Sequence, residues 1–178
     1  DPHAAAVADN QSRLAFVVAL EQEPAWPDDV LMLMVSPEGA AVVDADGRLM
    51  LHHVAQHGRS VKLLQAVYDA FPRAAATLDG KSQLPLVIGL QRADSCSDEE
   101  AMVLIDADAA SVADTHESYL LHHAARHGRS ALLLQAIVEA QPDAAAVFDD
   151  AGCLPMVTLL SAGDSSDDSQ LLSVLTSR

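Results

Sequence analysis

Two pairs of histidines are the residues in this sequence best suited to chemistry. His53 with His57, and His123 with His127, are each spaced by four residues, which places both imidazoles of a pair on one helix face, a spacing that zinc can use. Zinc–nitrogen bonds are about 2.0–2.1 Å long, whereas pairs that lie two stacked helices apart would be separated by roughly 16–20 Å. An isoleucine and an arginine occupy the intervening positions, so we expect no metal site.

No motif for catalysis or for cofactor binding is found elsewhere. The run Asp44-Ala45-Asp46-Gly47 begins like a calcium-binding loop, but Ala55 stands where the closing glutamate belongs. We interpret the run as a turn. The patterns G-x-S-x-G, G-x-G-x-x-G and H-E-x-x-H and the P-loop are all absent. We therefore expect a protein that is not an enzyme and that carries no cofactor.

The charge balance excludes two further classes of protein. Twenty-six acidic residues against ten basic ones give a net charge of -16. Nucleic-acid binding requires basic residues that replace the phosphate counterions, and binding to an anionic membrane surface requires them too. No apolar run approaches the roughly 20 residues of a membrane-spanning helix. We therefore expect neither nucleic-acid binding nor membrane insertion.

The two cysteines bear on the compartment. Cys96 and Cys153 are too few for a disulfide framework, and their spacing matches no metal site. This favours a reducing intracellular environment. No targeting peptide is visible at the start of the sequence, so the cytoplasm and the interior of an organelle both stay open.

The sequence repeats itself at two periods. The run His52–Ser60 recurs as His122–Ser130, a shift of 70 residues. Aspartates recur every 35 residues, as Asp9, Asp44, Asp79, Asp114 and Asp149. A fixed period of this length is typical of a repeat array. Residues 1–178 are therefore expected to form a single array, divided into the end of a preceding repeat (1–8), four full repeats (9–43, 44–78, 79–113 and 114–148) and an incomplete last repeat (149–178).

Each repeat is expected to contain two short helices. In the repeat 44–78, Leu51, Val54 and Ala55 form an apolar stripe at helical spacing. Gly58 can take the left-handed conformation that ends the first helix, and Ser60 can cap the start of the second. The stretch from the alanines after the second helix to the next aspartate is expected to be non-helical. Units this small cannot bury their stripes alone, so the copies must stack in an all-α array.

Odd-numbered repeats vary this plan. Pro85 stands at the first turn of a helix, where its missing N–H costs nothing. Ser97 and Glu100 form a capping box at the start of the second helix.

The run from Asp44 to Gly58 resembles the opening of the ankyrin repeat, D-x-x-G-x-T-P-L-H-x-A-x-x-x-G, and Leu84-Pro85-Leu86 and Leu154-Pro155-Met156 resemble its T-P-L-H element. This resemblance implies an ankyrin-like helical solenoid of paired antiparallel helices, with about five repeats of 35 residues. It also implies structural roles for His52 and His122, which would bond neighbouring backbone, and for Gly58 and Gly128. The pitch departs from the family's of about 33, and a Pro/Ala segment replaces the family's G-A-D-V-N ending. Whether β-hairpin fingers are present is left open.

In ankyrin-like arrays the exposed face of the first helices lines the concave groove where partners bind. Here that face is expected to be rich in histidine, arginine and glutamine. We call its nine candidate residues the predicted strip: His53, Gln56, His57, Ile88, Gln91, Arg92, His123, Arg126 and His127. Two interpretations of the predicted strip stay open: its residues contact a partner, or its cations cap helix C-termini, where positive charge is favoured. Two functions also stay open. The resemblance implies a protein–protein interaction module, a scaffold or adaptor, whose partner is another protein. The alternative is a constitutive structural or linker subunit of a larger assembly.

Overall fold

The computed structural model describes residues 14–22, 26–92 and 96–162, and in these residues the protein is all-helical with no strand. The expected end of a preceding repeat (1–8), the beginning of repeat 9–43 and residues 163–178 lie outside the described residues. Within the described residues, the four units up to residue 148 each contribute a first helix, a second helix and a single helical turn, and the last unit contributes a first helix. The elements in chain order are α2 (Ala15–Leu20), α3 (Asp28–Met32), α4 (Pro37–Ala40), α5 (Met50–His57), α6 (Val61–Ala70), η1 (Pro72–Ala76), α7 (Pro85–Leu90), α8 (Asp98–Val103), α9 (Ala107–Ala110), α10 (Leu120–Arg126), α11 (Ala131–Ala140), η2 (Pro142–Ala146) and α12 (Pro155–Ala162).

The helix ends follow the capping residues that the sequence predicts. Gly58 ends α5 in the left-handed conformation with φ of 61°, a region that costs other residues free energy. The Ser60 hydroxyl accepts a hydrogen bond from Leu63 N at the start of α6. Ser97 and Glu100 form both bonds of a capping box on α8. These local predictions are confirmed.

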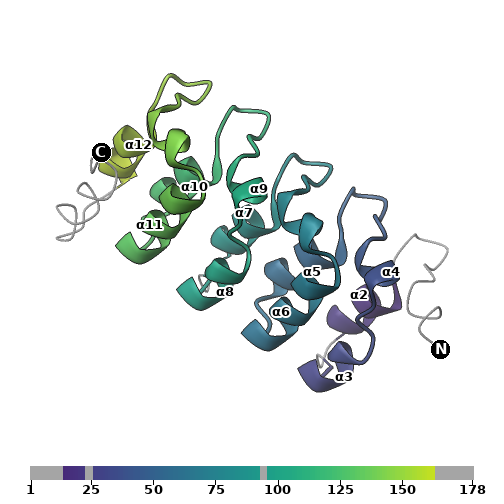
Figure 1. The fold of residues 1–178 in the computed structure, drawn as a ribbon. Coiled ribbons are helices and arrows are strands. Elements are labelled where there is room, and N and C mark those ends of the chain that lie inside the picture. The colour runs from purple at the N-terminus through teal and green to yellow at the C-terminus, as the bar shows by residue number, and fades with distance from the viewer. Residues whose placement is uncertain (1–13, 23–25, 93–95, 163–178) are drawn as a thin grey trace.

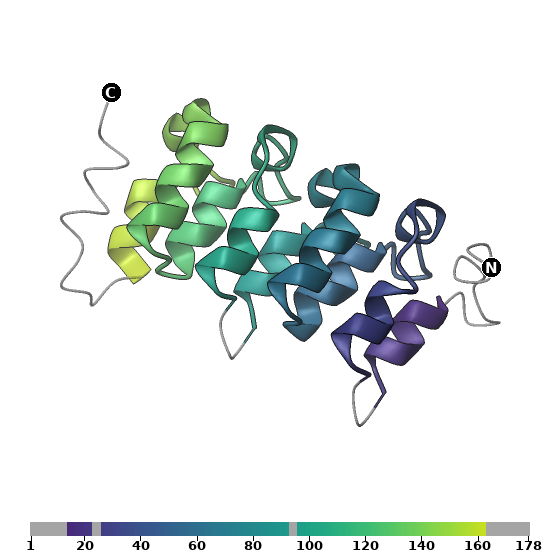
Figure 2. The same cartoon turned by 60° about the horizontal axis from the view of Figure 1, so that its bottom comes forward.

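The helices form two rows, because each helix packs against its counterpart in the next unit. The first-helix row is α2, α5, α7, α10 and α12, and the second-helix row is α3, α6, α8 and α11 (Figure 1). Turning the molecule shows that the units follow one another along the stack in chain order (Figure 2). Leu51, Leu63, Leu121 and Leu133 are completely buried between the rows. Helices of ten residues or fewer are marginal alone in water, so this packing is what stabilises them.

The alanine segments differ from expectation, because they are helical turns and not irregular chain. Pro72 and Pro142 begin the 3-10 turns η1 and η2, where proline's fixed φ suits a first helical position. In the other units Ser36 and Asp106 cap the equivalent turns α4 and α9 through hydrogen bonds from backbone N–H groups. Local side-chain capping and small alanines that permit close packing against the neighbouring unit together favour the helical form.

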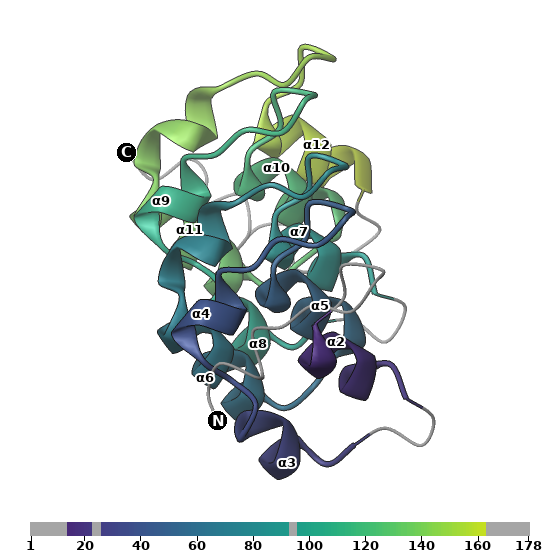
Figure 3. The same ribbon diagram turned by 90° about the vertical axis from the view of Figure 1, so that its right-hand side faces the viewer.

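Tight turns project side by side on the first-helix side of the stack (Figure 3). In the first of them Asp44 N donates to Arg48 O (2.9 Å) and Gly47 N donates to Asp44 O (3.1 Å), the hydrogen-bond pattern of a three-residue hairpin loop. The fourth residue of each turn has a positive φ, between 55° at Glu117 and 73° at Gly47. The described residues thus contain hairpin-type turns but no strands leading into them. We call these segments the aspartate turns: Asp44–Arg48, Asp79–Gln83, Asp114–Ser118 and Asp149–Cys153.

Candidate partner-binding site

One carboxylate oxygen of each turn aspartate holds its own turn together. Asp44 Oδ1 accepts hydrogen bonds from the backbone N–H of Asp46 (2.9 Å) and of Arg48 (2.8 Å). The same pair of bonds recurs at Asp79, at Asp114 and at Asp149. Aspartate suits this position because its short side chain can reach the backbone two and four residues ahead. The 35-residue spacing of the aspartates therefore marks the turns.

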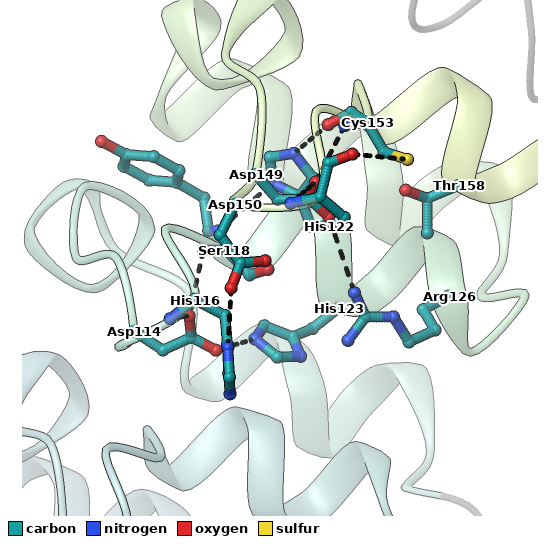
Figure 4. Close-up of polar contacts among 12 residues, drawn as sticks. Asp114, His116, Ser118, His122, His123, Arg126, Asp149, Asp150, Cys153 and Thr158 are labelled. Carbon is teal, nitrogen blue, oxygen red and sulfur yellow. Dashed lines mark hydrogen bonds and ion pairs between the residues drawn. The ribbon is translucent and has the colours of Figure 1, made fainter.

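The second carboxylate oxygen binds a side chain that differs between alternate units. Asp44 Oδ2 accepts from His53 Nε2 at 2.8 Å, and the same contact joins Asp114 and His123 at 2.9 Å. Asp79 Oδ2 instead accepts from Arg48 Nε at 3.2 Å. Asp149 Oδ2 lies 3.8 Å from Arg126 Nη2. Figure 4 shows the Asp114 and Asp149 arrangements next to each other.

These bonds lower the pKa values of Asp44, Asp79 and Asp114. Burial alone would raise the pKa of Asp44, but the backbone N–H of Arg48 and the His53 side chain outweigh it, so the pKa lies below its ordinary value. At Asp79 burial is likewise outweighed, by backbone N–H groups and then by Arg48, and the pKa is again lowered. The turns are thus held by charge-assisted hydrogen bonds.

Three residues of the predicted strip are buried, which corrects the sequence analysis. His53 is 6% exposed, Ile88 6% and His123 7%. A first helix has a neighbour on each side and an aspartate turn above it, so its buried surface is wider than one apolar stripe indicates. The two histidines are polar because they bind turn carboxylates inside that surface. We therefore remove both from the candidate binding residues.

The rest of the predicted strip is accessible in varying degree. Exposed members are Gln56, His57, Gln91, Arg126 and His127. Arg92 is largely enclosed: its Nη1 donates to Ala55 O at 3.2 Å and lies 3.6 Å from Glu100 Oε1. A Cβ at position 58 would collide with this guanidinium, so Gly58 also serves the close approach of Arg92. Arg92 therefore fits the interpretation in which the cations of the predicted strip cap helix ends.

His52 and His122 join backbone segments. His52 Nδ1 accepts from Leu49 N (3.1 Å), so the proton is on Nε2, which donates to Thr77 O (3.0 Å). His122 makes the equivalent bonds to Tyr119 N (3.2 Å) and Cys153 O (3.3 Å). Burial lowers the pKa of His52 to about 4, so the ring is neutral at pH 7. This bridging of backbone is the role that the resemblance implies.

Two arginines that the sequence analysis did not single out connect adjacent units. Arg59 Nε donates to Asp28 Oδ1 (2.8 Å), and the backbone N–H of Ser60 donates to Asp28 Oδ2 (2.9 Å). Arg129 repeats the contact with Asp98 at 3.1 Å. The sequence did mark both arginines, because the Gly-Arg-Ser run recurs at the 70-residue shift. The aspartate that each arginine binds was not evident, because it lies more than 30 residues upstream.

Replacing Arg59 with alanine should lower the free energy of unfolding by about 1–3 kcal/mol, because hydrogen bonds to charged groups contribute about this much. Arg73→Ala is the matched control, since that side chain is exposed and should change stability by less than about 0.5 kcal/mol. Urea unfolding followed by circular dichroism measures both variants. Equal midpoints for the two would contradict the role of Arg59 between units.

A polar hollow of about 260 Å³ opens where two aspartate turns meet helices α5 and α7. We call it the glutamine hollow, and its lining residues are Arg48, Gln56, Lys81, Gln83, Ile88, Gln91 and Arg92. Four of these belong to the predicted strip. Arg48, Lys81 and Gln83 were missed because they lie on turns, and only the stacking of the units brings the turns beside the helices. No carboxylate lines this hollow.

Hydrogen bonds within the hollow leave donors and acceptors for a ligand. Arg48 Nη1 donates to Gln56 Oε1 at 2.6 Å, and Gln83 Nε2 donates to Gln91 Oε1 at 3.1 Å. The amide nitrogens of Gln56 and Gln91 remain as donors, and Gln83 Oε1 remains as an acceptor. An adjoining hollow of about 340 Å³ shares Arg48 and Lys81 and is also lined by Asp46 and Asp79.

The described residues contain no cluster of three or more histidine, cysteine or acidic residues that could hold a metal ion. None of the helices within the described ranges has the length and apolar character needed to cross a bilayer. No family model matches the chain. No curated protein matches it either. The candidate site is therefore defined by the geometry of the glutamine hollow and of the exposed strip residues.

Proposed function

We propose that this protein is a non-catalytic interaction module, built as an ankyrin-like array, that binds a segment of a partner protein on its first-helix side. The observation that carries the proposal is the glutamine hollow, where four residues of the predicted strip meet three residues of the aspartate turns. Polar hollows that adjoin a rigid stack of helices can bind an extended peptide without rearranging.

The chemistry of the hollow suits a peptide. Glutamine amides offer a donor and an acceptor, as a peptide backbone does, and three glutamines lie around Ile88. The volume of about 260 Å³ is below the ~300–1,000 Å³ typical of sites that enclose a small molecule. A segment lying across the hollow fits better than an enclosed ligand.

The exposed residues extend this surface along the stack. His57 lies at the C-terminal end of α5, Arg126 ends α10, and His127 follows Arg126. Both helices belong to the first-helix row, so a partner segment that crosses the hollow could continue towards the units that contain α10 and α12.

Photocrosslinking tests the proposed side of the molecule. A photoreactive residue in place of Gln91, on the first-helix side, should crosslink a partner in native extracts. The matched control replaces Gln135, an exposed glutamine on α11 in the second-helix row, and should yield little of the same product. Crosslinks at position 135 and none at position 91 would contradict the proposal.

That contrary outcome would favour the alternative, a constitutive structural subunit of a larger assembly. This alternative is supported by exposed apolar side chains on or next to the second helices. Leu132 in α11 is 60% exposed, Met102 in α8 is 38% exposed, and Leu33 directly after α3 is 86% exposed. Apolar surface of this kind is often covered by a permanent partner when it forms a contiguous patch.

A further inference from the structure

The 70-residue shift allows the glutamine hollow to be compared with its counterpart two units further along the chain. Residues that hold the fold are the same in type and in contact at both places. His53 binds Asp44 as His123 binds Asp114, and Arg59 binds Asp28 much as Arg129 binds Asp98. The fold therefore imposes the same side chains wherever it needs them.

The lining of the hollow is not repeated. Arg48, Gln56, Lys81, Gln83, Ile88, Gln91 and Arg92 correspond at the 70-residue shift to Ser118, Arg126, Ala151, Cys153, Thr158, Ser161 and Ala162. The same turns and helices form at the second place. There, serine or alanine stands at the positions of the cations Arg48, Lys81 and Arg92. Serine also stands at the position of Gln91. The fold does not require Lys81 or Gln91, so their presence needs another explanation.

Two of the three cations have a structural explanation. Arg92 donates to Ala55 O and lies beside Glu100. Asp79 needs a cationic partner, and Arg48 supplies it from the turn. At the second place Arg126 approaches the equivalent Asp149 from the helix. One arginine beside Asp79 and one beside Asp149 is therefore a demand of the fold. The described residues provide no partner for the Lys81 ammonium group, and an alanine replaces it at the second place.

The charges around the hollow favour an anionic ligand. Arg48 and Lys81 line it and no carboxylate does. The carboxylates that pair with the arginines are withdrawn from solvent: the Asp79 side chain is 1% exposed and that of Glu100 12%. The lining of the hollow is thus cationic, although the chain carries a net charge of -16 and the exposed Asp46 lines the adjoining hollow.

Resting on the proposed function, we infer that the glutamine hollow binds an acidic segment of a partner protein. Carboxylates of the segment pair with Lys81 and Arg48, and its backbone bonds the amides of Gln56 and Gln91. A nucleic acid is disfavoured because its continuous charge would meet the acidic remainder of the surface. A short acidic segment concentrates its charge where the cations are.

Selection from a random library of twelve-residue peptides tests this inference. The intact chain is immobilised, and bound peptides are sequenced. The double variant Lys81→Ala/Gln91→Ser carries the residues found at the second place, so it should fold. Lys62→Ala, an exposed lysine on α6 in the second-helix row, is the matched control.

Peptides rich in aspartate and glutamate should be enriched on the unaltered chain and on Lys62→Ala. The double variant should bind them roughly five- to tenfold more weakly, because it loses one ion pair and one amide contact. Enriched peptides without acidic residues, or acidic peptides that bind the double variant equally well, would overturn the inference and leave the proposed function standing. Failure to enrich any peptide would contradict both.

Discussion

Replacing Asp79 with alanine should lower the free energy of unfolding by about 3 kcal/mol, the largest effect of a single polar substitution that we expect in this protein. The carboxylate accepts two backbone hydrogen bonds within its turn and a third from Arg48. Its side chain is 1% exposed, so water cannot take its place. The substitution leaves two backbone donors and one guanidinium without their acceptor.

Urea unfolding followed by circular dichroism measures this loss. Asp46→Ala is the matched control, because Asp46 lies on a turn of the same kind but its side chain is exposed, and it should shift stability by less than about 0.5 kcal/mol. Asp79→Asn should fall between the two, since it keeps the turn acceptor and loses the charge. Should Asp79→Ala unfold at the same urea concentration as Asp46→Ala, the turn aspartates would not stabilise the stack.

Acidification from pH 6.5 to pH 4 should destabilise the protein by about 3 kcal/mol through His52 alone. Burial lowers the pKa of His52 to about 4 from an ordinary value of 6.5. In this window the unfolded chain binds a proton on His52 and the folded protein does not, so stability falls by about 1.4 kcal/mol per pH unit. Burial also lowers the pKa of His122 and of His123, which adds to the same trend.

Asp44, Asp79 and Asp114 act in the same direction at lower pH. Their pKa values lie below the ordinary value of 3.8 in the folded protein, so the stability they contribute is present at higher pH and disappears as the pH falls through those lowered values. The histidines should therefore dominate between pH 6.5 and 4, and the carboxylates below that.

Urea midpoints at pH 7.5, 6 and 5 test the histidine contribution. His52→Asn should be less stable at pH 7.5 and should show a smaller loss of stability on acidification. His116→Asn is the control, because His116 is exposed and Asp150 raises its pKa, so its contribution has the opposite sign: it is present at low pH and is lost as the pH rises. A stability that stays constant from pH 6.5 to 5 would contradict the neutral, buried state of His52.

Some functional assignments failed for a reason that particular residues make plain. The predicted strip grouped His53 and His123 with the exposed polar residues, since polarity and helical spacing are all that a sequence offers at those positions. Their burial depends on the aspartate turn that begins nine residues upstream and folds back over the helix. Lys81 and Gln83 were missed for the converse reason, because nothing in their own turn indicates that helices α5 and α7 lie beside them.

The sequence by itself determined the 35-residue period, and, for the four units up to residue 148, the first and second helices and caps such as Ser60 and Ser97. These features depend on hydrogen bonds between residues at most four positions apart, such as those of Ser60 to Leu63 and of Ser97 to Glu100. Only the tertiary structure decided which polar residues are buried, which arginines connect units and where the glutamine hollow lies. The burial of His53 and His123 depends on turns that begin nine residues upstream and fold back over the helices. The arginine contacts and the hollow depend on side chains about 30 to 40 residues apart in the chain, such as Arg59 with Asp28, which meet only once the units have stacked.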